Sequence, residues 1–291
     1  MKPAAFEYTR PADIDEACAM LAADDGARVI AGGQTLVPLM AMRLARPTRL
    51  IDIARIPGLA YVRDNGHEIA IGATTKQHVA ENDPLVRARL PLLAKMLPYV
   101  GHDATRARGT VGGSLANGDH AAEIVLAAVT LDATLVYRED GANREIAASD
   151  FFLGPMVTAL PQGACLVEAR FPVWAEPRVG AAFHEVNARQ SDFAFVSAAA
   201  QIAVDPNGTI IRAAVGIGAV AATPLRFDSV IEELLNDGKW EPQVRESLQR
   251  ALAEIEPMGD LHASAAYRRR VAVTLGVRAI GDAYQAAMKR A

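Results

Sequence analysis

The sequence is poor in cysteine, in aromatic residues and in long apolar runs, and it has no excess of positive charge. Cys18 and Cys165 are the only cysteines among 291 residues, and they lie in unrelated sequence contexts. Two thiols cannot build a disulfide framework or supply the four ligands of an iron–sulfur cluster. The formal net charge of −4 argues against nucleic acid as the main partner, because binding to phosphate backbones requires a basic surface.

No apolar run is long enough to span a bilayer, and the first residues are partly acidic and lack the apolar core of a signal peptide. We therefore expect a cytoplasmic protein without membrane insertion. Aliphatic residues are abundant, since 51% of the residues are hydrophobic and only 5% are aromatic. A chain of this length can bury one large core or two to three smaller ones.

The first 56 residues predict a compact unit of alternating helices and strands. Asp13, followed three residues later by Glu16, is typical of a helix N-terminus, and the apolar spacing beyond it predicts a helix over 13–22. The patterns that follow predict a strand over 28–31, a helix over 36–44 and a strand over 49–53.

From residue 57 the pattern becomes more mixed. A turn at 64–66 predicts a hairpin, and the following segments predict helices over 83–97, with a break at Pro91, and over 121–131. Strand-like runs at 133–139 and 164–173 lead to a boundary near Pro172 and Pro177. Three further strand-like runs precede helices expected over 229–236, 242–255 and 264–290, the last with Arg268 and its other basic residues in solvent. This order predicts an α+β fold.

Two glycine motifs raise the main functional question. AGGQTL at 31–36 separates a predicted strand from a predicted helix, and TVGGS at 110–114 repeats the same chemistry. A glycine pair allows close backbone approach and positive φ, and a helix that begins after it offers free N–H groups to an anion. For either motif alone an ordinary tight turn is the alternative. The pair favours two neighbouring anionic groups, as in the pyrophosphate of a dinucleotide.

Other candidate sites are weaker. Residues 216–221 match G-x-G-x-x-A, but Thr223-Pro224 prevents a following helix, so we expect a buried strand there rather than a dinucleotide loop. The six histidines have no zinc-like spacing, and we predict no metal site. No G-x-x-x-x-G-K-[ST] loop occurs, and no nucleophile–histidine–acid set can be assembled, so no catalytic residue is assigned.

Taken together, the two glycine motifs resemble those of the FAD-binding medium subunits of molybdenum hydroxylases, the xanthine dehydrogenase and carbon monoxide dehydrogenase family. The resemblance covers nearly the whole chain and includes FFLGPMVT at 151–158, AFHEVNARQSDFAFV at 182–196 and ASAAYRRRVAVTLGVRAI at 263–280. It implies a PCMH-type FAD-binding domain over 1–176, with subdomains of about 1–56 and 57–176. A smaller α+β domain with an antiparallel sheet and helices would occupy 177–291.

The resemblance also implies which residues contact a noncovalently bound FAD. The first glycine loop would wrap the pyrophosphate, the second would oppose it, and Asn117 and Glu123 would contact phosphate or ribose. Phe193 matches an aromatic residue that covers the isoalloxazine in some relatives, and His184 stands where some have a lysine near the flavin. The implied cofactor-binding set is Val29, Ile30, Ala31, Gly32, Gly33, Gln34, Thr35, Leu36, Thr110, Gly112, Gly113, Ser114, Asn117, Glu123, Leu166, His184, Asp192 and Phe193.

For function, the resemblance implies electron transfer within a larger enzyme. In the family, a large molybdopterin subunit hydroxylates the organic substrate, a small subunit carries two two-iron two-sulfur clusters, and the FAD of the medium subunit passes electrons to an external acceptor. We therefore expect a large and a small partner, in a dimer of heterotrimers, and no turnover by this chain alone. Two alternatives stay open, namely a self-sufficient flavin oxidoreductase and a structural subunit with a vestigial nucleotide site.

Overall fold

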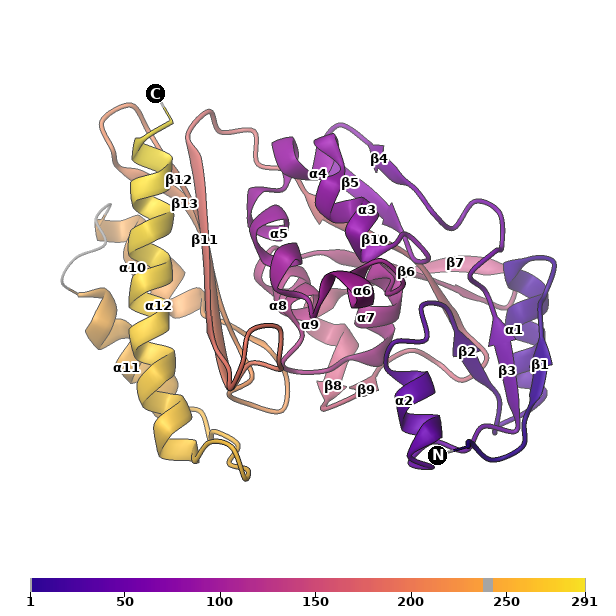
Figure 1. Cartoon of the computed structure of the whole chain (residues 1–291). Coiled ribbons are helices and arrows are strands. Elements are labelled where there is room, and N and C mark those ends of the chain that lie inside the picture. Colours follow the sequence, from indigo (N-terminus) through magenta and orange to yellow (C-terminus); the bar gives the residue numbers. More distant parts are fainter. Residues whose placement is uncertain (1, 238–242, 291) are drawn as a thin grey trace.

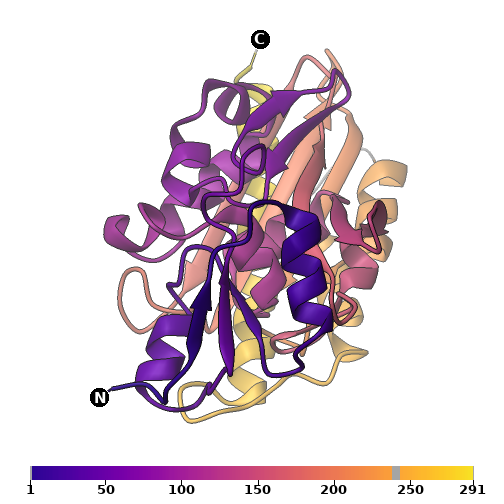
Figure 2. The ribbon, with the colours of Figure 1, turned by 90° about the vertical axis from the view of Figure 1, so that its right-hand side faces the viewer.

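The computed structural model describes residues 2–237 and 243–290, whose strands form three main sheets and one small hairpin sheet. The three main sheets follow one another along the molecule, with the N-terminal sheet at one end and the C-terminal helix α12 at the other (Figures 1 and 2). One sheet is parallel and the other two are antiparallel. The α+β fold predicted from the sequence is thus confirmed.

The first sheet is parallel, with strand order β1-β3-β2. Asp13 caps α1 as predicted, because its Oδ1 accepts a hydrogen bond from the Glu16 N–H at 2.9 Å. The helix predicted over 36–44 ends earlier, at Ala41, and Arg43 just beyond it has a positive φ of 61°. The elements of this part are β1 (Glu7–Thr9), α1 (Ile14–Ala22), β2 (Arg28–Ile30), α2 (Leu36–Ala41) and β3 (Arg49–Asp52).

The second sheet has five strands in the order β4-β5-β10-β6-β7, and several short helices lie between β5 and β6 in sequence. The predicted hairpin is the β4–β5 pair, and the predicted break at Pro91 separates α4 from α5. The elements are β4 (Val62–Asp64), β5 (Glu68–Gly72), α3 (Gln77–Asn82), α4 (Pro84–Arg89), α5 (Pro91–Met96), a 3-10 turn η1 (Leu97–Tyr99), α6 (Asp103–Arg106), α7 (Val111–Asn117), α8 (Glu123–Thr130), β6 (Thr134–Glu139), β7 (Ala142–Ala147), α9 (Ala148–Phe151), β8 (Phe152–Gly154), β9 (Val157–Thr158) and β10 (Cys165–Pro172).

The third sheet is antiparallel and is covered by helices on both faces. In Figure 1, α12 packs on one face and α5 with α8 lies toward the other. The predicted helix over 242–255 begins at Pro242, which lies outside the described residues, and α11 is described from Val244. The elements are β11 (Val179–Val186), β12 (Val196–Val204), β13 (Ile210–Gly218), β14 (Leu225–Arg226), α10 (Asp228–Asp237), α11 (Val244–Ala253) and α12 (Ala265–Met288).

The largest apolar core joins the second and third sheets. It contains α5 and α8 residues together with Phe183 of β11 and Ala199 of β12. The segment that matched G-x-G-x-x-A is a buried strand end, as predicted, because Gly216 lies in β13. A Cβ at Gly216 would stand 2.0 Å from Thr130 Oγ1 of α8, so the glycine permits close packing between strand and helix.

One long-range neighbourhood could not be inferred from the sequence, and one interpretation of the sequence is wrong. Cys18 of α1 and Cys165 of β10 are far apart in sequence, but they are buried in one apolar cluster, where Cys18 Sγ donates to the Arg138 carbonyl at 3.4 Å. Arg268, which was expected in solvent, is 4% exposed. Helical periodicity placed it next to a polar face, but three oxygen acceptors from other segments surround its guanidinium and allow it to be buried.

Candidate functional site

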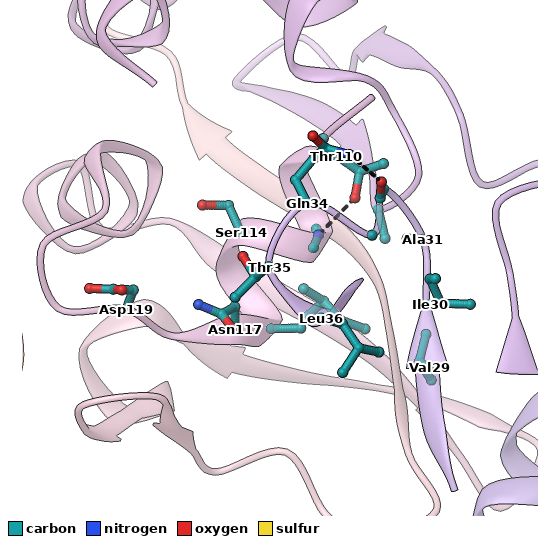
Figure 3. A pocket seen from close by; sticks show the side chains of 18 of the residues that line it. Val29, Ile30, Ala31, Gln34, Thr35, Leu36, Thr110, Ser114, Asn117 and Asp119 are labelled. Carbon is teal, nitrogen blue, oxygen red and sulfur yellow. Dashed lines mark hydrogen bonds between the residues drawn. The ribbon is translucent and has the colours of Figure 1, made fainter. Parts of the chain in front are cut away.

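A cavity of about 830 Å³ lies where the three parts of the chain meet. Its walls come from the loop between β2 and α2, from the segment 100–123, from the segment 158–166 and from the loop between β11 and β12. Figure 3 shows side chains of both glycine loops around this cavity. Its volume falls within the roughly 300–1,000 Å³ of typical small-molecule and cofactor pockets.

The first glycine loop differs from most of the chain in its unused backbone N–H groups. From Gly32 through Leu36, five consecutive N–H groups have no hydrogen-bond acceptor within the described residues. Gly33 adopts a positive φ of 70°, and the Gln34 side chain braces the loop by donating from Nε2 to the Gly32 carbonyl at 3.0 Å. Thr35 makes no side-chain cap and keeps its hydroxyl available. Such a row of N–H donors is a binding site for an anion.

The second glycine loop uses its backbone differently. Val111 N–H donates to Thr75 O at 2.9 Å, Gly112 N–H to Ala73 O at 3.0 Å, and Gly113 N–H to Thr110 Oγ1 at 3.0 Å. The sequence suggested that this loop repeats the chemistry of the first, and for these N–H groups that expectation is wrong. Two of them anchor the loop to the chain after β5, and the third bonds to Thr110 of the loop itself. What the loop offers the cavity is the side chains of Ser114 and Asn117, which Figure 3 labels among the lining residues.

The two loops touch at Gly32. A Cβ there would stand 2.6 Å from Arg108 O and 2.7 Å from Gly109 Cα, so only glycine lets the two backbones approach this closely. The contact fixes the spacing between the N–H groups of the first loop and the polar side chains of the second.

Carboxyl groups line the cavity just beyond the second loop. Glu123, in the first turn of α8, is 8% exposed, and burial raises its pKa to about 7. Burial also raises the pKa of nearby Glu185 to about 8, and the charge of Glu123 adds to this rise. Asp119 Oδ1 accepts a hydrogen bond from the Ala121 N–H at 2.9 Å. This end of the cavity therefore accepts hydrogen bonds from hydroxyl groups more readily than it accepts anions.

The third part of the chain contributes Ser191, Asp192 and Phe193 from the β11–β12 loop. Ser191 has a positive φ of 67°, which costs a non-glycine residue about 1–2 kcal/mol. Arg189 Nε pairs with Asp192 Oδ2 at 3.0 Å, and the Phe193 ring is 69% exposed. A strained loop with an exposed aromatic ring beside a cavity is typical of a ligand-binding segment.

All but one of the residues assigned to the cofactor from the sequence line this single cavity. The exception is His184. Its Nε2 lies 2.8 Å from Asp282 Oδ2 of α12, on the face of β11 opposite to that of its neighbour Phe183, which contacts Tyr99. Alternation along a strand explains this placement. The residues that were assigned to the cofactor from the sequence and that line the cavity are Val29, Ile30, Ala31, Gly32, Gly33, Gln34, Thr35, Leu36, Thr110, Gly112, Gly113, Ser114, Asn117, Glu123, Leu166, Asp192 and Phe193.

Sequence reasoning missed part of the wall. Gln77 lines the cavity with its Oε1 buried and without a hydrogen-bond partner among the described residues, and the segment from Thr158 to Cys165 forms another side. Asp119 also lines the cavity and was not among the residues assigned to the cofactor. The proline, glutamine and glycine at 161–163 were the one available signal, since such a cluster marks a loop.

Comparisons with known proteins match both parts of the chain. Residues 4–174 match the family model described as the FAD binding domain in molybdopterin dehydrogenase, and residues 181–283 match the CO dehydrogenase flavoprotein C-terminal domain. Among the described residues, no helix combines the length and the apolar character needed to cross a membrane.

Individual relatives match over almost their whole length. The chain is 33% identical to the carbon monoxide dehydrogenase medium chain of Hydrogenophaga pseudoflava, covering 98% of this chain and 99% of that one. It is 32% identical to the 6-hydroxypseudooxynicotine dehydrogenase complex subunit alpha of Paenarthrobacter nicotinovorans, covering 97% and 96%. A solved structure of carbon monoxide dehydrogenase from Hydrogenophaga pseudoflava superimposes with a TM-score of 0.94 at 33% identity, covering 98% and 99%.

Proposed function

This chain belongs to the family of FAD-binding flavoprotein subunits of the molybdopterin dehydrogenases, and we propose that it carries electrons through an FAD held in the cavity between its three parts. The observation that carries this proposal is the row of five N–H groups from Gly32 through Leu36, which line a cavity large enough for a dinucleotide and have no acceptor in the part of the chain that the structure describes. A pyrophosphate satisfies such donors without any cationic side chain.

Different residues of the cavity bind different parts of FAD. The first loop binds the pyrophosphate, and Ser114 and Asn117 add side-chain hydrogen bonds from the opposite side. Glu123 accepts hydrogen bonds from sugar or ribityl hydroxyls, and the exposed ring of Phe193 covers the isoalloxazine. When bound, FAD supplies the reversible uptake of two electrons, and the protein supplies orientation and shielding from solvent.

The chain works as one subunit of a larger enzyme. Its relatives are called a medium chain and a complex subunit, and this chain has only two cysteines, too few to ligate an iron–sulfur cluster. We assign the molybdopterin to a large partner subunit and two two-iron two-sulfur clusters to a small one, in a dimer of heterotrimers. The cytoplasmic location expected from the sequence belongs to the same proposal and is checked by cell fractionation.

The division into an FAD-binding domain over 1–176 and a C-terminal domain over 177–291 is also proposed. It is supported by the strand pairing, because among the described strands no main sheet mixes members from the two sides of this boundary. Limited proteolysis is expected to cut first between β10 and β11.

The relatives act in enzymes named for carbon monoxide and for 6-hydroxypseudooxynicotine, so the substrate is selected outside this subunit.

The cofactor is tested on the purified full chain. We expect a yellow protein that releases FAD into the supernatant on denaturation. Recovery of FMN alone, or of a flavin that stays attached to the chain, would contradict the pyrophosphate assignment. A folded chain that binds no flavin, even when FAD is added, would favour a structural subunit with a vestigial site.

The role as a subunit is tested by comparing the chain alone with the co-expressed complex. Alone, it is expected to bind FAD but to oxidise no organic substrate. Together with its large and small partners it is expected to co-purify, and substrate then bleaches the flavin absorbance. Turnover of an organic substrate by the isolated chain would instead identify a self-sufficient flavin oxidoreductase.

A further inference from the structure

Arg268, in the first turn of α12, is a buried cation that the FAD site described so far does not use. Its side chain donates from Nη1 to the carbonyl of Phe195 at 2.5 Å and to that of Ala219 at 2.7 Å, and from Nη2 to Asp260 Oδ2 at 2.7 Å. Its Nε is buried without a partner among the described residues. Burying a guanidinium is expensive, so its position here calls for a role beyond packing.

The first acceptor, Phe195, ends the loop that carries the cavity residues Ser191, Asp192 and Phe193. At the base of this loop the Phe195 N–H donates to Val186 O at 2.7 Å, and the Phe195 carbonyl accepts from Arg268. Figure 1 shows the start of α12 at the same end of the third sheet as this loop. Arg268 therefore anchors the loop at the point where its chain re-enters β12.

The second acceptor, Ala219, connects Arg268 to the opposite wall of the cavity. Ala219 has a positive φ of 62°, and its N–H donates to the His120 carbonyl at 3.0 Å. His120 follows Asp119, which lines the cavity. Ala121, Ala194 and Ala219 pack together in a small cluster of their own. One guanidinium thus joins the loop of Phe193 to the turn that leads into α8 and Glu123.

The planar fork of arginine suits this task. Two carbonyls and a carboxylate are held by fixed N–H directions, which neither a lysine ammonium nor an apolar side chain can reproduce. Arg269 and Arg270, the next residues on the helix, are exposed. Arg269 donates to Ile255 O, and Arg270 lies over the Tyr267 ring at 5.6 Å, so neither contacts a cavity wall.

We propose that Arg268 is a positioning residue for the flavin, which fixes the Ser191–Phe193 wall of the cavity against the wall formed by Asp119 and Glu123. This inference rests on FAD occupying the cavity. Arg268 does not line the cavity and acts only through the two carbonyls that it binds.

The test uses the full chain, stripped of FAD and titrated with it, in variants Arg268→Lys and Arg268→Met with Arg270→Met as the matched control. Affinity, visible circular dichroism and flavin fluorescence are measured at a temperature where every variant is folded. Arg268→Met is expected to weaken FAD binding by about tenfold or more, the order expected when hydrogen bonds from a charged donor are lost. The flavin signals should move toward those of free FAD. Arg268→Lys should fall between Met and wild type, and Arg270→Met should match wild type.

A double-mutant cycle separates positioning from a general loss of stability. If Arg268 acts through the Phe193 loop, Arg268→Lys and Phe193→Ala will have non-additive effects on FAD affinity and on flavin fluorescence. Thermal unfolding of the FAD-free chain is measured alongside. A residue that is merely structural lowers the unfolding midpoint but leaves the affinity and spectrum of the folded fraction unchanged.

The outcomes are distinct from those for the proposed function. If wild type binds FAD and folded Arg268→Lys keeps both the affinity and the flavin spectrum of wild type, the positioning role is overturned while the FAD assignment stands. Additive effects in the double-mutant cycle would show that Arg268 does not act through the loop that carries Phe193. If wild type itself binds no FAD, the proposed function fails. Should Arg268→Met not fold, Arg268→Lys alone decides.

Discussion

The two glycine loops look alike in sequence and each makes a close backbone contact, but they use their backbone N–H groups differently. In the first, five N–H groups from Gly32 through Leu36 have no acceptor within residues 2–237 and 243–290. In the second, the N–H groups of Val111, Gly112 and Gly113 donate hydrogen bonds to other groups of the protein. The same dipeptide thus leaves its N–H groups without acceptors among the described residues in one loop, and in the other bonds them to neighbouring residues.

The difference follows from what surrounds each loop. The first loop follows an edge strand of a parallel sheet, Gly33 has a positive φ of 70°, and no neighbouring segment within the described residues supplies acceptors for its N–H groups. The second runs beside Ala73, where a Cβ at Gly112 would stand 2.6 Å from Ala73 Cα. Backbone groups that lie against another segment are hydrogen-bonded to it, since leaving them unpaired is costly. Only side chains, namely Ser114 and Asn117, remain free there.

The largest effect is expected at the first loop. Gly33→Asp adds a carboxylate among the N–H donors and forces a positive φ on a residue with a Cβ. Repulsion from a pyrophosphate and the loss of donor geometry should weaken FAD binding by about a thousandfold or more. FAD titration of the folded, flavin-free chain measures this.

Gly141→Asp is the matched control. Gly141 has a similar φ of 74° in the β6–β7 turn, and a Cβ there would have no neighbour within 4 Å. It should show the backbone strain of about 1 kcal/mol in thermal unfolding but normal FAD affinity. Normal flavin occupancy in Gly33→Asp would mean that the first loop holds no phosphate.

The next effect is expected from Glu123, beside the second loop. Its pKa of about 7 in the folded chain lies above its ordinary value of 4.5, because burial disfavours the charge. Between these two pH values the folded state keeps a proton that the unfolded state has lost. Stability therefore falls as pH rises from about 4.5 to 7, by about 2–3 kcal/mol, and the loss persists above pH 7.

Glu123→Gln should remove most of that decline. The measurement is denaturant unfolding of the flavin-free chain at pH 5, 6, 7 and 8. Glu185 titrates in the same direction, with a pKa raised to about 8, so Glu185→Gln is the companion variant. If wild type and Glu123→Gln have parallel pH profiles, the carboxyl is ionised in the folded protein and the hydroxyl-binding role loses its basis.

The sequence predicted local structure better than it predicted the composition of the cavity. Local signals worked well, since Asp13 caps α1, the turn at 64–66 makes the β4–β5 hairpin and Pro91 separates two helices. The residues of the cavity were found through family resemblance, because lining a shared cavity is a property of the whole fold. Edge strand β7 was missed because most of its residues are exposed, and its sequence therefore lacks an alternating apolar pattern.

Long-range partners were the part that no pattern could reveal. His184 was placed near the flavin by analogy, but the alternation of β11 turns it toward Asp282. Arg268 was assigned to solvent because its acceptors, Phe195 and Ala219, come from segments distant in sequence. The use of the N–H groups of the second loop likewise depends on Ala73 and Thr75. Hydrogen bonding between remote segments is decided by packing, not by local spacing.

A smaller effect is expected from Gly112→Ala, which tests the structural role of the second loop. The added Cβ would stand within 2.7 Å of three Ala73 atoms, two of them backbone, so the loop must shift. The free energy of unfolding should fall by about 2 kcal/mol, as for other overpacked positions. Gly154→Ala, whose Cβ would have no contact closer than 3.9 Å, should be near neutral. Equal stability of the two variants would refute the close-contact role.

The smallest effects are expected from the side chains that the second loop presents. Ser114→Ala and Asn117→Ala each remove one potential hydrogen bond to the cofactor while leaving the backbone bonds of the loop intact. Each should weaken FAD binding by about threefold to tenfold, the value of a single neutral hydrogen bond, without changing the unfolding midpoint of the flavin-free chain. Ser149→Ala, at an exposed position of α9 outside the cavity, is the control. Losses as large as that of Gly33→Asp would show that the second loop carries the main anion site, and unchanged affinity in both variants would leave the first loop as the sole phosphate contact.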